Sequence, residues 1–221
     1  MLDQSTAKGR LLVAALDQAA KKPWGDVTLL DIAEGAGVPL ADLRTEFTGK
    51  TDIIAALLRA VDDEVLKRTP SRSEGQEKRD ALFDIIMTRF DVLGPYKPAL
   101  KSIYASGAAD FSLAGPYLAS QHWMLQSAGI GTDGATGALR VAGLGLTYAS
   151  VFRIWLDDDD AGLARTMAAL DRRLRRGQQT LDGLEQFGAA FSRFGAAMQD
   201  IVRGATQGRP KKEAGPDTRS P

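Results

Sequence analysis

The chain has 221 residues, of which 44% are hydrophobic and 25% are charged, so it can bury a normal globular core and shows no bias toward disorder. Its formal net charge is zero, which argues against a chain that binds polyanions over its whole surface. The absence of cysteine excludes disulfides, thiolate zinc sites and cysteine nucleophiles, and it fits the reducing cytoplasm in which we expect the protein to work.

Apolar residues recur at helical three- and four-residue spacing almost throughout, and no period-two strand pattern is convincing. We therefore expect an all-α chain. The first helix is expected from about Ser5 to Lys22, where Pro and Gly in the segment KPWGDV (22–27) stop it. Thr28, with Asp31 three residues later, then has the pattern of a helix start.

A helix-turn-helix pattern follows from the next breaks in the chain. Gly37 ends the helix that starts at Thr28, and Pro39 fits the first turn of a second short helix. Two short helices and a turn within about twenty residues are typical of this motif. After the segment TGK (48–50), an amphipathic connecting helix is expected over residues 51–68.

The remainder of the chain predicts a helical body. It follows a polar linker at 69–76 that contains Pro and Gly. The tail at 204–221 is basic and rich in Gly and Pro, and we expect it to be disordered. Between them, helices are expected at 78–93, 97–106, 113–128, 134–156, 161–178 and 181–203.

Residues 27–57, VTLLDIAEGAGVPLADLRTEFTGKTDIIAAL, strongly resemble the N-terminal domain of the tetracycline-repressor (TetR) family of transcription regulators. The first helix before this string and the all-α body after it complete the family layout. The matching features are Thr28 at the cap, the turn IAEGAGV, the core residues Leu43 and Phe47, and Gly49-Lys50 at the opening of the next helix.

The resemblance implies a three-helix DNA-binding-type domain at 1–50 and a ligand-binding and dimerisation body at 51–203. It implies a homodimer, joined through the helices at 134–156 and 161–178, that places one recognition helix per protomer in successive major grooves of its operator DNA. The carried-over positions are Thr28 and Lys50 for phosphate contacts, and Pro39, Leu40, Arg44 and Thr45 for the groove.

The chain departs from the family pattern in this motif. Pro39 stands where the family usually has Ser or Thr, Arg44 replaces a common Tyr, and Glu46 stands where His is frequent. Residues 1–66 contain seven basic and eleven acidic residues, a formal net charge of −4. Because phosphate neutralisation supplies most DNA affinity, the alternative is a helix-turn-helix fold retained without DNA binding.

The body resembles a second group. Residues 78–103, 123–130 and 154–174 look like the lipid-binding auxiliary proteins of ubiquinone biosynthesis, which share the TetR fold but do not bind DNA. That resemblance implies an isoprenoid lipid in the body and a C-terminal amphipathic helix that docks on membranes.

The helix expected at 181–203 is a candidate for that membrane contact. No stretch approaches the roughly 20 apolar residues of a membrane span, and the N-terminus lacks a secretion signal, so we expect contact with the membrane surface at most. The apolar stripe could enter a bilayer surface, or it could pack on the protein's own core or on a dimer partner. Its members are Leu184, Phe187, Phe191, Phe194 and Met198.

The sequence offers no constellation for catalysis. His122 is the only histidine, so a histidine metal cluster cannot form. The run DDDD (157–160) lacks the alternating ligands and glycine of a calcium loop, and we expect it to end one helix and place negative charge at the start of the next. Without a Ser-His pair, a phosphate-binding glycine loop or paired catalytic carboxylates, we expect no enzyme, no cofactor and no metal.

Large aromatic or flexible side chains in the body helices predict an apolar interior suited to a hydrophobic ligand, although the same residues would serve as plain core. The leading hypothesis is a homodimeric, ligand-responsive DNA-binding regulator. The alternative is a lipid carrier that assists quinone biosynthesis at a membrane. The candidate ligand residues are Met87, Phe90, Tyr104, Tyr117, Trp123, Tyr148, Phe152 and Trp155.

Overall fold

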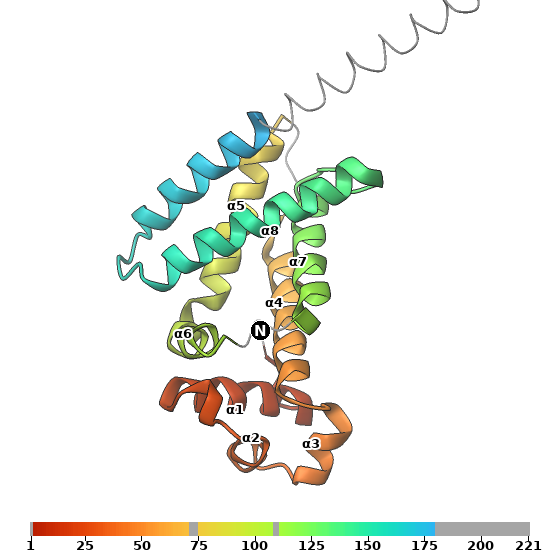
Figure 1. The fold of residues 1–221 in the computed structure, drawn as a ribbon, viewed down its shortest axis with the longest axis vertical. Coiled ribbons are helices and arrows are strands. Elements are labelled where there is room, and N and C mark those ends of the chain that lie inside the picture. The colour runs from red at the N-terminus through yellow and green to blue at the C-terminus, as the bar shows by residue number, and fades with distance from the viewer. Residues whose placement is uncertain (1, 71–74, 108–110, 180–221) are drawn as a thin grey trace, which may run out of the picture. The chain divides into compact units, whose positions relative to one another are not determined.

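The computed structural model describes residues 2–70, 75–107 and 111–179 (Figure 1). Over these residues it is helical and contains no strand, which confirms the all-α prediction. Residues 1–176 cluster as one unit and residues 177–221 as another. The helices are α1 (Ala7–Lys21), α2 (Leu29–Ala36), α3 (Leu40–Glu46), α4 (Lys50–Arg68), α5 (Lys78–Leu93), α6 (Lys97–Ala105), α7 (Ala114–Ser127), α8 (Gly134–Leu156) and a last one over 164–179, with 3-10 turns at Trp24–Asp26, Gly94–Tyr96 and Phe111–Leu113.

Local side-chain chemistry sets the ends of α2. Asp31 N donates to Thr28 Oγ1 at 3.1 Å, and Thr28 N donates to Asp31 Oδ2 at 2.7 Å, so the two residues form a reciprocal capping box. The helix ends at Gly37, whose φ of 61° lies in the left-handed region that favours glycine. Both signals read from the sequence, the start at Thr28 and the break at Gly37, are confirmed.

A shared apolar core holds the three N-terminal helices together. Leu43 of α3 is 1% exposed, and Phe47, directly after α3, is 4% exposed, as expected for the two core residues of this motif. α1 contacts α2 and α3 on one side of the motif and α6 of the body on another. The motif is thus packed against the body as well as joined to it along the chain.

The body is built around α4, which runs from the helix-turn-helix into the larger group of helices (Figure 1). α4 packs against α5 and α7, and α7 packs against α8. The expected bounds of these helices agree with the structure to within one residue at each end for α5, α6, α7 and α8. The hydrophobic pattern therefore located the body helices well.

The last described helix begins at residue 164, three residues later than expected, because carboxylates of the acidic run cap it. Asp158 Oδ2 accepts hydrogen bonds from Thr166 N at 2.9 Å and from Thr166 Oγ1 at 2.7 Å. Asp160 Oδ2 accepts from Ala164 N at 3.1 Å. The hydroxyl of Thr166 lowers the pKa of Asp158, which keeps the cap charged. The expected capping role of the run is confirmed.

The predicted amphipathic helix at 181–203 and the tail at 204–221 lie outside the described residues. Among the helices that the structure does describe, none is both long enough and apolar enough to cross a bilayer.

Candidate nucleic-acid interface and ligand core

α3 presents a surface that no other part of the described protein covers. Apart from the buried Leu43, every residue of this helix is exposed, and Leu40 is 47% exposed. Because successive residues turn by about 100° around an α-helix, the exposed side chains fall into three parallel rows. The rows are Leu40 with Arg44, Ala41 with Thr45, and Asp42 with Glu46.

These rows give α3 one cationic edge and one anionic edge. Thr45, in the middle row, donates its hydroxyl to Ala41 O at 3.2 Å, so the centre of the exposed face is small and shallow. Arg44 is the only cation on the helix, and Asp42 and Glu46 lie together on the opposite edge. A duplex that met this face squarely would bring phosphates near both edges, attracted by one and repelled by the other.

The hydroxyl of Thr28 already has a role within the domain. Thr28 Oγ1 donates to Asp31 Oδ2 at 2.7 Å, and Lys22 Nζ donates to the same oxygen at 2.7 Å. Lys22, together with the two donors of Thr28, holds the pKa of Asp31 well below its ordinary value. Lys22, one of the few cations of the motif, is therefore engaged in an ion pair with Asp31.

Lys50 also turns inward. Its ammonium donates to Trp24 O at 2.6 Å and to Val27 O at 2.8 Å, and it lies 4.8 Å from the centre of the Trp24 ring. Burial lowers the pKa of Lys50 despite the nearby Asp26. The side chain therefore fastens the start of α4 to the turn between α1 and α2. The expected phosphate contact stays a prediction that rests on the partly exposed N-terminus of α4.

Replacing Lys50 with Met should lower the free energy of unfolding by about 1–2 kcal/mol, because two backbone carbonyls lose a charged donor. Urea unfolding followed by circular dichroism measures the change. Lys8→Met, at an exposed position of α1, is the matched control and should leave the midpoint unchanged. Equal midpoints for the two variants would show that Lys50 does not hold α4 to the turn.

Ser102 of α6 joins the body to this same turn. Its hydroxyl accepts a hydrogen bond from Trp24 N at 2.8 Å and donates one to Lys22 O at 3.1 Å. Lys97, at the start of α6, donates to Asp158 O and lies 5.0 Å from the centre of the Trp155 ring. α6 therefore contacts the helix-turn-helix on one side and the end of α8 on the other. Sequence reasoning missed both contacts, because each joins residues more than fifty positions apart.

The centre of the body holds a buried charged pair. Arg89 of α5 is 2% exposed and pairs with Asp62 of α4, while its Nε donates to Tyr148 Oη at 3.1 Å. Ser120 Oγ donates to Asp62 Oδ2 at 2.6 Å. Burial opposes the charge of Arg89, but Tyr148 and Asp62 favour it and the balance raises its pKa. This network links α4, α5, α7 and α8.

Six of the eight expected ligand residues gather beside this pair. Phe90 stacks on Tyr148 and Trp155 with ring centres 5.6 and 5.2 Å apart, and Phe152 lies 5.9 Å from Tyr148. Tyr104, which is 49% exposed, contacts Phe152 edge-on at 6.1 Å. Tyr117 lies 6.3 Å from Tyr148 and donates its hydroxyl to Gly145 O. The aromatic array thus runs from the surface at Tyr104 to the buried Arg89.

The other two expected ligand residues differ in exposure. Trp123 is 51% exposed and lies edge-on to His122, so its expected place in an apolar interior is wrong. It points outward because α7 places Ser120, Gln121 and Met124 on its buried side. Met87 is partly buried and packs against the main core.

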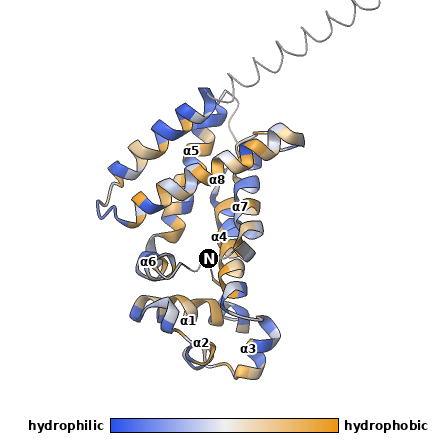
Figure 2. Cartoon of the chain, in the orientation of Figure 1, coloured by the Kyte–Doolittle hydropathy of each residue, from blue (hydrophilic) through white to orange (hydrophobic). Residues whose placement is uncertain are grey.

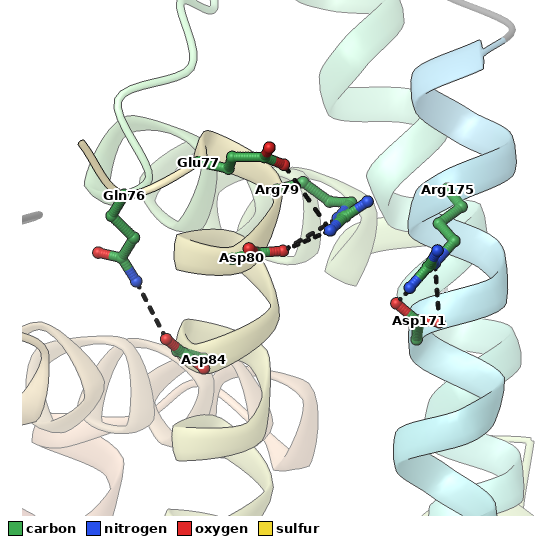
Figure 3. A network of polar contacts seen from close by, with 7 residues as sticks. All are labelled: Gln76, Glu77, Arg79, Asp80, Asp84, Asp171 and Arg175. Atoms are coloured by element: carbon green, nitrogen blue, oxygen red, sulfur yellow. Dashed lines mark hydrogen bonds and ion pairs between the residues drawn. The ribbon is translucent and has the colours of Figure 1, made fainter.

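An open groove of about 450 Å³ lies between the start of α5 and the helix at 164–179 (Figure 3). None of the expected ligand residues lines it. Four of its charged side chains form two pairs: Arg79 Nη2 donates to Asp80 Oδ1 at 2.7 Å, and Arg175 Nε donates to Asp171 Oδ2 at 2.9 Å. Asp84, which also lines the groove, accepts from Gln76 Nε2 at 3.1 Å, so the lining carries two arginines and three aspartates.

α8 exposes a long apolar stripe. Leu139 is 49% exposed and Leu146 is 77% exposed, and the residues of this helix are mostly coloured as hydrophobic in Figure 2. Helical spacing places these leucines in one row with small exposed residues, namely Ala135, Ala138, Ala142, Gly143 and Ala149. Such a stripe on a helix expected to join two protomers is suited to close helix packing.

The sequence matches no protein-family model, and no curated protein is a significant relative. Solved structures are similar. A TetR transcriptional regulator from Rhodococcus sp. RHA1 aligns with TM-score 0.60 and 19% identity over 78% of this chain and 96% of its own. The TetR transcriptional regulator from Nitrosomonas europaea ATCC 19718 aligns with TM-score 0.61 and 21% identity over 77% of this chain and 97% of its own. A TetR-family transcriptional regulator from Streptomyces coelicolor aligns with TM-score 0.54 and 19% identity over 89% of this chain and 99% of its own. The chain has the TetR-type fold predicted from its sequence.

Proposed function

We propose that this chain is a homodimeric transcription regulator that binds operator DNA through α3 and responds to a hydrophobic small ligand in its body. The observation that carries the proposal is the exposed face of α3. Leu43 and Phe47 anchor that helix to the core, while Leu40, Arg44 and Thr45 are left free for a groove. Proteins of the same fold are described as transcriptional regulators, which supports the assignment.

Arg44 is the residue on which DNA reading by this helix depends most. It is exposed and is the only cation of α3, and an arginine in a major groove bonds guanine with two donors. Arg44→Ala should therefore weaken operator binding about fivefold or more, at a cost of about 1–3 kcal/mol.

Fluorescence anisotropy measures this binding on duplexes tiled across the DNA upstream of the chain's own reading frame, from about 50 to about 200 mM salt. Arg59→Ala, at an exposed position of α4, is the matched control. If the wild-type protein binds none of these duplexes but co-floats with anionic liposomes, the proposed regulator function is wrong and the lipid-carrier function takes its place. Binding that Arg44→Ala leaves intact would remove α3 from the interface.

The homodimer is proposed to form through the apolar stripe on α8. Leu146→Glu places a carboxylate at the most exposed leucine of the stripe, and it should split the dimer into monomers because an unpaired charge would be buried between protomers. Light scattering coupled to size exclusion gives the mass. Leu30→Glu, at a leucine of α2 that is 51% exposed, makes the same change elsewhere and should leave a dimer. A dimer that survives Leu146→Glu would place the interface on another face.

A further inference from the structure

Gln121 of α7 has a buried oxygen with no hydrogen-bond partner. Its side chain is 0% exposed, and Nε2 donates to Tyr117 O at 3.2 Å, while Oε1 bonds to nothing. A reversed amide would set Oε1 against the Tyr117 carbonyl, so the oxygen is the end that lacks a partner. An unpaired buried acceptor is costly, and native proteins leave few of them.

The residue next to Gln121 along α7 belongs to a buried, charge-balanced network. Ser120, the adjacent residue, is also fully buried and bonds to Asp62, whose charge Arg89 cancels. A charged ligand would unbalance this pair in a medium of low polarity, and an isolated buried charge is strongly unfavourable. The interaction missing at Gln121 Oε1 is one hydrogen-bond donor.

Aromatic rings lie in the same part of the body. The rings of Tyr104, Phe152 and Tyr148 follow one another at 6.1 and 5.9 Å, from the exposed Tyr104 to the fully buried neighbours of Arg89. Gln121 lies on this side of α7, because its Cγ comes within 3.8 Å of the place where a side chain of Gly145 in α8 would begin. Aromatic ligands stack on such rings with specific geometry.

We propose that the body ligand is an uncharged aromatic molecule with a hydroxyl or N–H group that donates to Gln121 Oε1. The inference rests on the proposed function, since it names the chemical class of the ligand to which the regulator responds. The aromatic array holds the rings of the molecule, and the charge-balanced pair of Arg89 and Asp62 excludes anions and cations alike.

A matched pair of probes tests the donor directly. 4-Butylphenol carries the hydroxyl, and 4-butylanisole replaces that hydrogen by a methyl group. Isothermal titration calorimetry on the full chain without DNA should show about tenfold tighter binding of the phenol, the difference made by one hydrogen bond to a buried acceptor. Equal affinities for the two probes, or tighter binding of the anion octanoate, would overturn the proposal.

Gln121→Met removes the acceptor and keeps the volume. It should abolish the preference for 4-butylphenol, while Gln126→Met, at an exposed position of the same helix, should retain it. Without ligand, Gln121→Met should raise Tm by about 2–6 °C, because the unpaired buried oxygen is gone. A lower Tm would give Gln121 a structural role and overturn the proposal. Phenol selectivity is measured without DNA, so its loss is distinguishable from a failure of DNA binding.

Discussion

Asp42→Asn combined with Glu46→Gln should raise the affinity of the protein for DNA about thirtyfold at low salt. Both carboxylates lie on one edge of the exposed face of α3, where they oppose phosphates that Arg44 attracts from the other edge. A like-charge contact at about 4 Å in water costs about 1 kcal/mol. Removing two such contacts gives about 2 kcal/mol, where about 1.4 kcal/mol is tenfold. Fluorescence anisotropy with upstream and with scrambled duplexes measures the gain.

The fold-gain should be the same for scrambled DNA as for the operator, because charge neutralisation is blind to sequence. Asp63→Asn with Asp91→Asn is the matched control, since both residues are exposed on the body helices α4 and α5 and the change in net charge is the same. The control should gain much less than the α3 variant, because charges farther from the DNA act more weakly and salt screens them, with a Debye length of about 10 Å at 0.1 M salt. A control that gains as much would show that net charge, and not α3, governs the binding.

The sequence was most informative where structure is local. The capping box of Thr28 and Asp31, the left-handed Gly37 and the buried Leu43 and Phe47 each depend on residues within a few positions of one another. Helical periodicity placed α5 and α8 at their observed bounds for the same reason. The candidate recognition helix could therefore be found without coordinates, down to the residues that anchor it.

The candidate site was less predictable wherever a contact joins distant residues. Lys50 fits a phosphate contact by position, but its ammonium reaches back to carbonyls at Trp24 and Val27. Trp123 fits an aromatic interior by type, yet it lies on the outer side of α7. Only the packing of whole helices decides which partner a long side chain meets.

Arg89 and Asp62 belong to the same class of long-range contact. They are 27 positions apart, on α5 and α4, and no short motif announces the pair. A buried arginine also runs against the usual expectation that this side chain is exposed. The sequence did identify most residues of the aromatic array around the pair, since six of the eight candidate ligand residues lie in it.

Asp62→Leu should lower the free energy of unfolding by about 3–5 kcal/mol, because it leaves the guanidinium of Arg89 buried without its counter-charge. Arg89→Met should cost a similar amount for the opposite reason, since the carboxylate of Asp62 then loses its cation and keeps the hydroxyl of Ser120 as a donor. Urea unfolding monitored by circular dichroism measures both. Asp63→Leu, at the exposed next position of α4, is the matched control and should change stability by less than about 1 kcal/mol.

The double variant Asp62→Leu with Arg89→Met decides what the pair does. Removing both charges also removes both desolvation costs, so its stability should return to within about 1–2 kcal/mol of wild type, and the two single effects should be strongly non-additive. Simple addition of the two losses would mean that each residue acts through packing alone. If stability recovers but the response of DNA binding to ligand does not, then the pair serves regulation. That outcome is expected because Asp62 lies on the helix that starts at the helix-turn-helix, while Arg89 lies among the rings proposed to hold the ligand.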